Sequence, residues 1–196
     1  MDYDFFAYLG RMNYIKRWAL MRSTVDENIK EHSYDVAMIA HALALIENKM
    51  YGASIDGYKV VCLALYHEAG EVITGDLPTP IKYFNSQINS AYKDLEKRAC
   101  EKLIRTLPDE LKEEYSSYLL TDENCTEYKI MKWADKISAY IKCVNEVKGG
   151  NKEFVKAKAS IGKSLKKSDM QCVKYFVDCI LPSFEKTLDE LDFGVE

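Results

Sequence analysis

The chain of 196 residues is predicted to adopt an all-α fold. Apolar residues recur at spacings of three and four through most of it, which is the period of an amphipathic helix. Helix breakers are scarce, with only nine glycines and four prolines. No segment shows the alternation of polar and apolar residues that is typical of a half-buried strand. Because no Ser/Gly-rich linker or internal repeat divides the sequence, we expect residues 1–196 to form a single domain.

The first predicted helix extends from Asn28 to Asn48. One face of this helix is apolar except for a histidine. It consists of His32, Val36, Ile39, Leu43 and Ile46. The second helix begins at Asp56, which can cap it, and continues to Glu71. Its buried face mixes apolar and polar side chains: Val60, Leu63, Ala64, His67 and Glu71. Both helices therefore direct a histidine toward the core, and the second is expected to bring His67 and Glu71 together.

The glycine and two prolines of the segment from Gly75 to Pro80 predict a stiff loop that bears Asp76. A third helix is expected from Gln87 to Leu107, ended by Pro108.

Three more helices complete the predicted fold. The first runs from about Glu123 to Lys148, stops at two consecutive glycines, and carries Asp135 on the border of its apolar stripe. The others lie near residues 152–167 and 169–191. Pro182 is expected to interrupt or kink the last helix.

Composition excludes several classes of protein. The net charge of -4 and the pI near 5.5 argue against binding to polymeric nucleic acid, although one positive pocket stays compatible with them. Six cysteines without a C-x-x-C pair indicate buried thiols in a reducing compartment. Residues 1–20 do not resemble a signal peptide, and no segment approaches the roughly 18 apolar residues that span a bilayer. We expect a cytoplasmic protein without a membrane partner.

The histidines suggest a metal site. His32 and His67 lie on apolar helix faces, and Glu68 and Asp135 add two carboxylates. A single histidine on an apolar face is more often a core residue, and this interpretation stays open beside metal binding. Imidazole and carboxylate ligands suit zinc, manganese, cobalt or ferrous iron without choosing among them. His41 lies about 180° from His32 around the helix, so it is expected to face away.

Three further residues have a possible chemical role. Glu71 follows His67 by one turn and is placed to act as a general base toward a water molecule, although an exposed helical glutamate is the simpler interpretation. Arg17 can bind phosphate, and the adjacent Trp18 can pack on a sugar or base. As an isolated dipeptide, Arg17-Trp18 is more often a structural tryptophan beside a solvated arginine.

Taken together, several motifs resemble one family over nearly the whole chain. These are Arg17-Trp18 with Met21-Arg22, Glu31-His32-Ser33, His67-Glu68, the run from Glu71 through Thr74-Gly75-Asp76-Leu77-Pro78-Thr79-Pro80 to Asn85, and Lys132-Trp133-Ala134-Asp135-Lys136. The chain resembles the bacterial 5′-deoxynucleotidases of the HD-domain phosphohydrolase superfamily. The resemblance implies an all-helical HD fold, commonly a homodimer, that removes phosphate from deoxyribonucleoside 5′-monophosphates with one divalent metal ion (Co, Mn, Zn, Cu or Fe).

The resemblance also implies a role for individual residues. The metal ligands would be His32, His67, Glu68 and Asp135, and Glu71 would orient or deprotonate the attacking water. Substrate binding would fall to four residues: Arg17 on the phosphate, Trp18 and Asp76 on the deoxyribose, and Thr74 in the same loop.

Glu68 departs from the family pattern, which has aspartate there. Its extra methylene moves the carboxylate by up to about 1.5 Å, whereas ligand distances are normally held within about 0.2 Å. Three alternatives follow: a metal-dependent deoxynucleotidase, a nucleotide-binding HD protein with impaired catalysis, and a different HD phosphohydrolase or a scaffold with a vestigial site.

Overall fold

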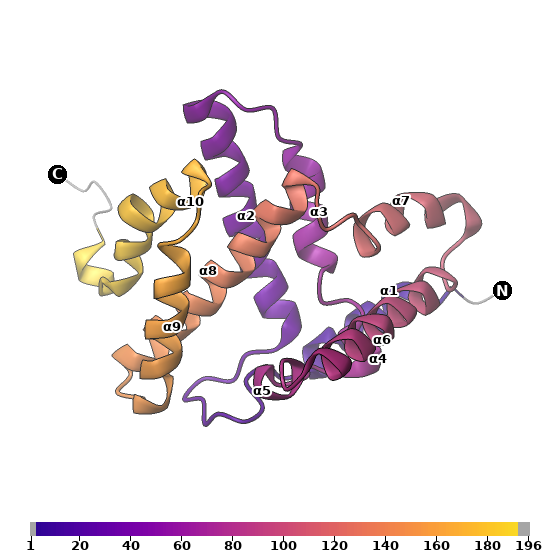
Figure 1. Cartoon of the computed structure of the whole chain (residues 1–196), viewed down its shortest axis with the longest axis horizontal. Coiled ribbons are helices and arrows are strands. Elements are labelled where there is room, and N and C mark those ends of the chain that lie inside the picture. Colours follow the sequence, from indigo (N-terminus) through magenta and orange to yellow (C-terminus); the bar gives the residue numbers. More distant parts are fainter. Residues whose placement is uncertain (1–2, 192–196) are drawn as a thin grey trace.

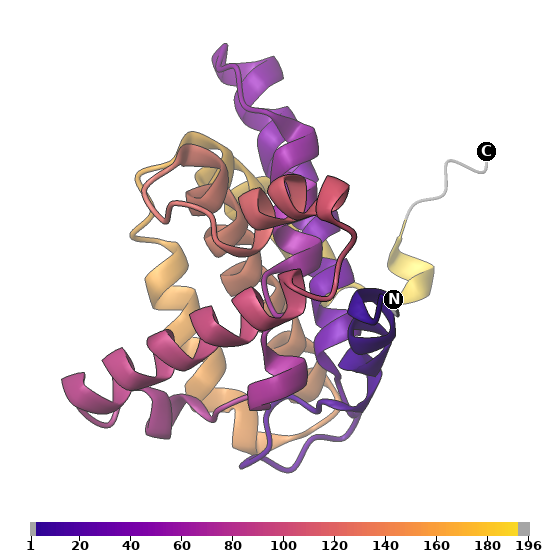
Figure 2. The ribbon, with the colours of Figure 1, turned by 90° about the vertical axis from the view of Figure 1, so that its right-hand side faces the viewer.

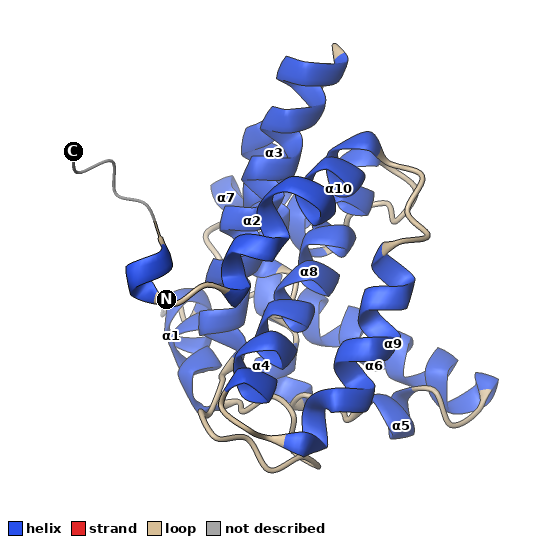
Figure 3. Cartoon of the chain, turned by 90° about the vertical axis from the view of Figure 1, so that its left-hand side faces the viewer, coloured by secondary structure: helices blue, strands red, loops and turns tan. Residues whose placement is uncertain are grey.

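The computed structural model describes residues 3–191, and every regular element in this range is a helix (Figure 3). Extended backbone pairs only at an isolated antiparallel bridge between Lys16 and Asn28, within the same range. The predicted all-α fold is therefore confirmed. Among the described residues, no helix is both long and apolar enough to cross a bilayer.

Three helices form the centre of the molecule: α2 (Ile29–Tyr51), α3 (Gly57–Tyr66) and α8 (Thr126–Lys148) (Figure 1). Helix α2 begins where predicted, because the Asn28 side chain accepts hydrogen bonds from two backbone amides and Glu31 completes a capping box. Asp56 caps α3, with its side chain accepting a hydrogen bond from the backbone amide of Lys59. The facing sides of the three helices share one apolar core that includes Leu43 and Ile137.

Helices α9 (Val155–Leu165) and α10 (Gln171–Tyr175) extend this core on one side (Figure 1). The single helix expected over 169–191 is not formed. A π-helical turn (Phe176–Ile180) and 3-10 turns (Leu181–Glu185 and Leu188–Glu190) follow α10 instead. Pro182 lies in the first 3-10 turn, where it cannot donate the backbone hydrogen bond that an α-helix requires.

A second group of helices lies on the other side of the centre. It comprises α1 (Phe5–Gly10), α4 (Glu71–Thr74), α5 (Thr79–Lys82), α6 (Ser86–Ile104) and α7 (Asp109–Leu119). A smaller core of Phe5, Ala69, Leu103 and Leu107 joins these helices. The end of α6 that adjoins α5 projects away from the rest of the chain (Figure 2).

Two predicted boundaries were wrong. The second helix ends at Tyr66 rather than Glu71, and the next short helix starts only at Glu71. The third helix ends at Ile104, and Pro108 precedes α7 instead of ending α6. Proline is compatible with the start of a helix, because the first amides of a helix have no internal partner.

The cysteines match the prediction in part. All six are free, and Cys62, Cys143 and Cys172 are buried as expected. Cys179 is exposed, and the remaining two are half-buried. The expectation of uniformly buried thiols was therefore wrong, because Cys179 lies in the irregular segment after α10 rather than on an apolar helix face.

Candidate metal centre

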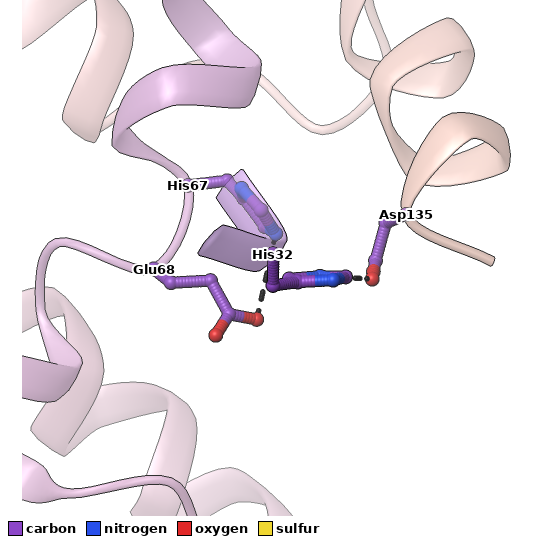
Figure 4. A group of neighbouring side chains, drawn as sticks. All are labelled: His32, His67, Glu68 and Asp135. Carbon is purple, nitrogen blue, oxygen red and sulfur yellow. Dashed lines mark hydrogen bonds and ion pairs between the residues drawn. The ribbon is translucent and has the colours of Figure 1, made fainter. Parts of the chain in front are cut away.

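Four side chains that can bind a metal converge between the central helices (Figure 4). They are His32, His67, Glu68 and Asp135, and one ligand atom from each lies within 4.8 Å of all the others. His32 comes from the first turn of α2 and Asp135 from the middle of α8. His67 and Glu68 come from the turn that follows α3. The chain thus brings together the four residues singled out as ligands.

Hydrogen bonds fix the orientation of both histidine rings. His67 Nδ1 lies 2.7 Å from the carbonyl oxygen of Ala64, so this nitrogen donates and leaves Nε2 as a free acceptor toward the cluster. His32 is completely buried, with Ser138 Oγ 3.2 Å from Nδ1 and Asp135 Oδ1 3.1 Å from Nε2. The contacts of His67 with Ala64 and of His32 with Ser138 are of the kind that hold ligand rings in place in metal sites.

The cluster fits a divalent cation. His67 Nε2 and one oxygen of Glu68 are buried without a hydrogen-bond partner. Buried polar atoms are rarely left in this state, because losing water without a replacement costs about 1–3 kcal/mol each. Imidazole nitrogen and carboxylate oxygen atoms are ligands that zinc, manganese, cobalt or iron accept. A bound cation would satisfy His67 Nε2, which faces the Oε1 oxygen of Glu68 at 3.4 Å.

Neighbouring cationic and hydrogen-bonding side chains keep the two acidic ligands charged. Burial alone would raise the pKa of Asp135, but Lys132, whose Nζ is 2.7 Å away, and His32 hold it well below its usual range. Burial likewise opposes ionisation of Glu68, and Arg17 at 3.3 Å outweighs it, so the pKa of Glu68 is also lowered. Both side chains are therefore carboxylates at neutral pH.

Glu71 lies just outside the cluster of four. It is buried, and one of its oxygens has no partner. Burial, followed by the negative charges of Glu68 and Asp76, raises the pKa of Glu71. The position of Glu71 does not result from the continuous helix that was expected. The chain leaves α3 after Tyr66 and turns at Gly70, whose backbone lies so close to Cys100 that an added Cβ would be 3.2 Å from its Sγ.

Arg17 reaches the cluster, and Trp18 follows it in the same loop. Arg17 Nη1 is 3.3 Å from Glu68 Oε1, and only 13% of the Arg17 side chain is exposed. Burial alone would lower the pKa of Arg17, but the charges of Glu68 and Glu27 raise it further above its usual range. The Trp18 ring packs on Phe154, with 5.3 Å between ring centroids. Arg17 is thus a buried cation rather than a solvated surface residue.

The loop after α4 contributes Thr74 and Asp76. The hydroxyl of Thr74 donates to the carbonyl oxygen of Gly75, so in this conformation it is turned to its own backbone. Burial and the charge of Glu68 raise the pKa of Asp76, whereas Arg17 lowers it. Tyr92 of α6 donates to the Gly75 carbonyl oxygen at 3.2 Å and fastens the loop.

Three residues of the site were not predicted: Lys132, Ser138 and Glu27. Lys132 and Ser138 stand three residues before and after Asp135, so helical spacing alone would have placed them beside it. Glu27 contacts Arg17 and Trp18 through a loop, and no sequence spacing indicates such a contact. His41 is exposed and takes no part, as expected.

Two histidines and two carboxylates from three segments around the central core, within an all-α fold, define a metal-dependent phosphohydrolase of the HD type. The comparison with known families narrows this class. The family model described as 5′-deoxynucleotidase YfbR-like matches residues 4–184. The chain belongs to this family of phosphoric monoester hydrolases.

Curated relatives match over almost their full length. The 5′-deoxynucleotidase of Shewanella oneidensis is 45% identical over 188 residues, which cover 95% of this chain and 96% of that protein. The 5′-deoxynucleotidase YfbR of Salmonella paratyphi B is 48% identical over 190 residues, covering 95% and 94% respectively.

Solved structures agree on the fold. An HD-domain phosphohydrolase from Listeria innocua superposes with a TM-score of 0.80 at 26% identity, over 92% of this chain and 88% of that one. The HD phosphohydrolase DatZ of cyanophage S-2L, solved with dA and one catalytic Zn²⁺ ion, has a TM-score of 0.63 at 17% identity, over 92% and 96%. At that identity the second likeness concerns the fold alone.

Proposed function

We propose that this chain is a metal-dependent 5′-deoxynucleotidase that hydrolyses deoxyribonucleoside 5′-monophosphates to deoxyribonucleosides and phosphate. One observation carries the proposal: the buried guanidinium of Arg17 lies beside a four-residue cluster that fits a divalent cation. Two positive centres side by side suit a phosphate monoester. The relatives named 5′-deoxynucleotidase support the same reaction.

The cation would be held by His32, His67, Glu68 and Asp135. When bound, a divalent ion supplies Lewis-acid stabilisation of negative charge and makes water a stronger acid. The ligand set suits Co, Mn, Zn, Cu or Fe. Its mixture of neutral imidazoles and charged carboxylates favours none of them.

Glu71 would accept the proton of the attacking water. Its buried carboxyl lies just outside the cluster and has an oxygen without a partner, which can accept that proton once a bound cation offsets the negative charges that raise its pKa. The water oxygen forms a bond to phosphorus, the bond from phosphorus to the 5′-oxygen breaks, and the leaving 5′-oxygen takes up a proton, equivalent to the one that Glu71 accepted, to become the 5′-hydroxyl of the deoxyribonucleoside. Arg17 would stabilise the charge on the phosphate oxygens.

Sugar recognition would involve the three remaining predicted residues. Trp18 would close over the 2′ position, since rejecting an added hydroxyl requires a clash or an unpaired polar group. Asp76 would accept a hydrogen bond from the 3′-hydroxyl, and Thr74 would support the loop. We further propose that residues 1–196 act as one domain, as a cytoplasmic homodimer.

The test measures phosphate release by the purified chain, loaded with one divalent metal at a time, from a deoxyribonucleoside 5′-monophosphate and from the ribonucleotide with the same base. We expect release from the deoxy substrate and little from the ribonucleotide. Equal release from both would refute the proposed sugar recognition. No release with any of the five metals would refute the proposed function.

A nucleotide-binding protein with impaired catalysis is the second candidate. The contact between Glu68 and Arg17 favours it, because the longer side chain occupies a guanidinium that phosphate would otherwise bind. The substitution Glu68→Asp withdraws the carboxylate and separates the candidates. Equal phosphate release by both proteins would show that Glu68 is a functional ligand, whereas release only by the Glu68→Asp variant would support the binding protein.

A further inference from the structure

Glu27 contacts both residues proposed to bind phosphate and sugar. One oxygen of its carboxylate, Oε2, accepts a hydrogen bond from Trp18 Nε1 at 2.8 Å and lies 3.1 Å from Arg17 Nε. The Arg17 amide also donates to the backbone oxygen of Glu27 at 2.9 Å. The side chain of Glu27 is only 11% exposed. Glu27 is therefore a buried acid that touches two functional side chains at once.

The backbone of Trp18 shows why such a contact matters. Its φ of 60° lies in the left-handed region, and Trp18 is the only residue other than glycine with this conformation among residues 3–191. For a large aromatic residue this conformation costs on the order of 1–3 kcal/mol and persists only where surrounding contacts enforce it. Those contacts are the Glu27 carboxylate, the Phe154 ring, and the Met21 amide, which donates to Trp18 O.

Arg17 is held between two acids. Glu68 faces Nη1, and Glu27 faces Nε, where the close approach lacks the alignment of a hydrogen bond. Glu27 thus acts on Arg17 through charge, and on Trp18 through a directed hydrogen bond. The two effects can be removed separately, because glutamine keeps an acceptor for the indole but carries no charge.

We propose that Glu27 is a positioning residue that fixes Trp18 relative to Arg17 and thereby determines the selection of deoxyribose over ribose. The inference rests on the proposed function, since Trp18 discriminates sugars only if a nucleotide binds with its phosphate on Arg17. A rotation of the Trp18 ring away from Glu27 would open the 2′ position while leaving the cation cluster intact.

The experiment uses the emission of Trp18 as well as activity. The chain has two tryptophans, so a Trp133→Phe background leaves Trp18 as the single reporter. Glu27→Ala and Glu27→Gln are compared in this background with Asp26→Asn. Asp26 is the matched control, because it is the adjacent acid, 69% exposed, and pairs with Lys16 instead of the site.

We expect Glu27→Ala to increase the quenching of Trp18 by acrylamide and to lower the deoxy-to-ribo ratio of kcat/KM at least tenfold. Glu27→Gln should keep the quenching and the ratio within about threefold of the background, while KM falls for both nucleotides, because removing a negative charge beside Arg17 strengthens its attraction for the phosphate. Asp26→Asn should change neither quantity.

The inference would be overturned if Glu27→Ala changed neither the acrylamide quenching of Trp18 nor the deoxy-to-ribo ratio of kcat/KM. An unchanged KM in a folded Glu27→Gln protein would overturn it as well. Quenching is read without substrate, so it decides the position of Trp18 even for a chain that releases no phosphate. Absence of phosphate release from the background protein would instead contradict the proposed function.

Discussion

Replacing Glu68 by glutamine should greatly weaken the binding of the divalent metal. The substitution keeps the length of the side chain and removes its negative charge, so the geometry of the cluster changes little. Glu68 Oε1 lies 3.4 Å from His67 Nε2 and 3.3 Å from Arg17 Nη1, which places the lost charge at the centre of the site. Loss of a partner that only supports a ligand weakens metal binding roughly 10–100-fold. For a direct ligand we therefore expect at least about 100-fold, or about 2.7 kcal/mol.

The metal-free variant should also be less stable. Arg17 loses one of its two buried partners, and breaking a buried ion pair costs about 3–5 kcal/mol when nothing else compensates the charge. Glu27 stays 3.1 Å from Arg17 Nε, so we expect a smaller loss of unfolding free energy, about 1–3 kcal/mol.

The assay is calorimetric titration of the chelated protein with one divalent metal, followed by denaturant unfolding of the metal-free forms. Glu71→Gln is the matched control, because Glu71 is also a buried acid with an oxygen that lacks a partner but stands outside the cluster of four. It should keep its metal affinity and lose phosphate release. Equal metal affinity of Glu68→Gln and the parent would refute the assignment of Glu68 as a ligand.

Three other substitutions test the elements that support the site. Glu146→Gln should lower the unfolding free energy by about 1–3 kcal/mol at pH 7. Burial alone would raise the pKa of Glu146, but its hydrogen bond to Lys142 and further hydrogen bonds lower it in the folded protein. The stability that Glu146 contributes is therefore fully present above the unfolded pKa of about 4.3, and it is lost as the pH falls through the lower pKa of the folded protein. A gap between parent and variant melting temperatures that does not narrow below about pH 4 would contradict this. Tyr92→Phe removes the hydrogen bond to Gly75 and should raise KM about fivefold, with kcat nearly unchanged, since about 1 kcal/mol is lost from the loop of Asp76; an unchanged KM would show that the loop does not need this bond. Gly75→Ala should destabilise the fold by about 1–3 kcal/mol in denaturant unfolding, because φ is 73° there, and a variant as stable as the parent would mean that the loop rearranges.

Local signals predicted the central helices, and the family resemblance singled out the four residues that the cluster brings together. Asn28 and Asp56 cap α2 and α3 where expected, because a cap acts on amides only two or three residues away. The apolar period then fixed which side chains point inward. His32 and Asp135 could be assigned to the interior for this reason.

Tertiary contacts explain what the sequence did not predict. The second helix breaks after Tyr66, although its apolar period continues, because Gly70 packs closely against Cys100. Helix α7 follows a proline that could equally end the preceding helix. The contacts of Glu27 depend on a loop whose path no local pattern specifies.

Metal titration of phosphate release is the most direct test of the central claim, that one divalent ion on His32, His67, Glu68 and Asp135 supports hydrolysis of deoxyribonucleoside 5′-monophosphates. The chelated chain is titrated with metal, and the initial rate is followed against equivalents added. We predict no release from the chelated chain and a rise to a plateau at one equivalent per chain. Equal rates with and without metal, or a plateau only at two equivalents, would contradict it.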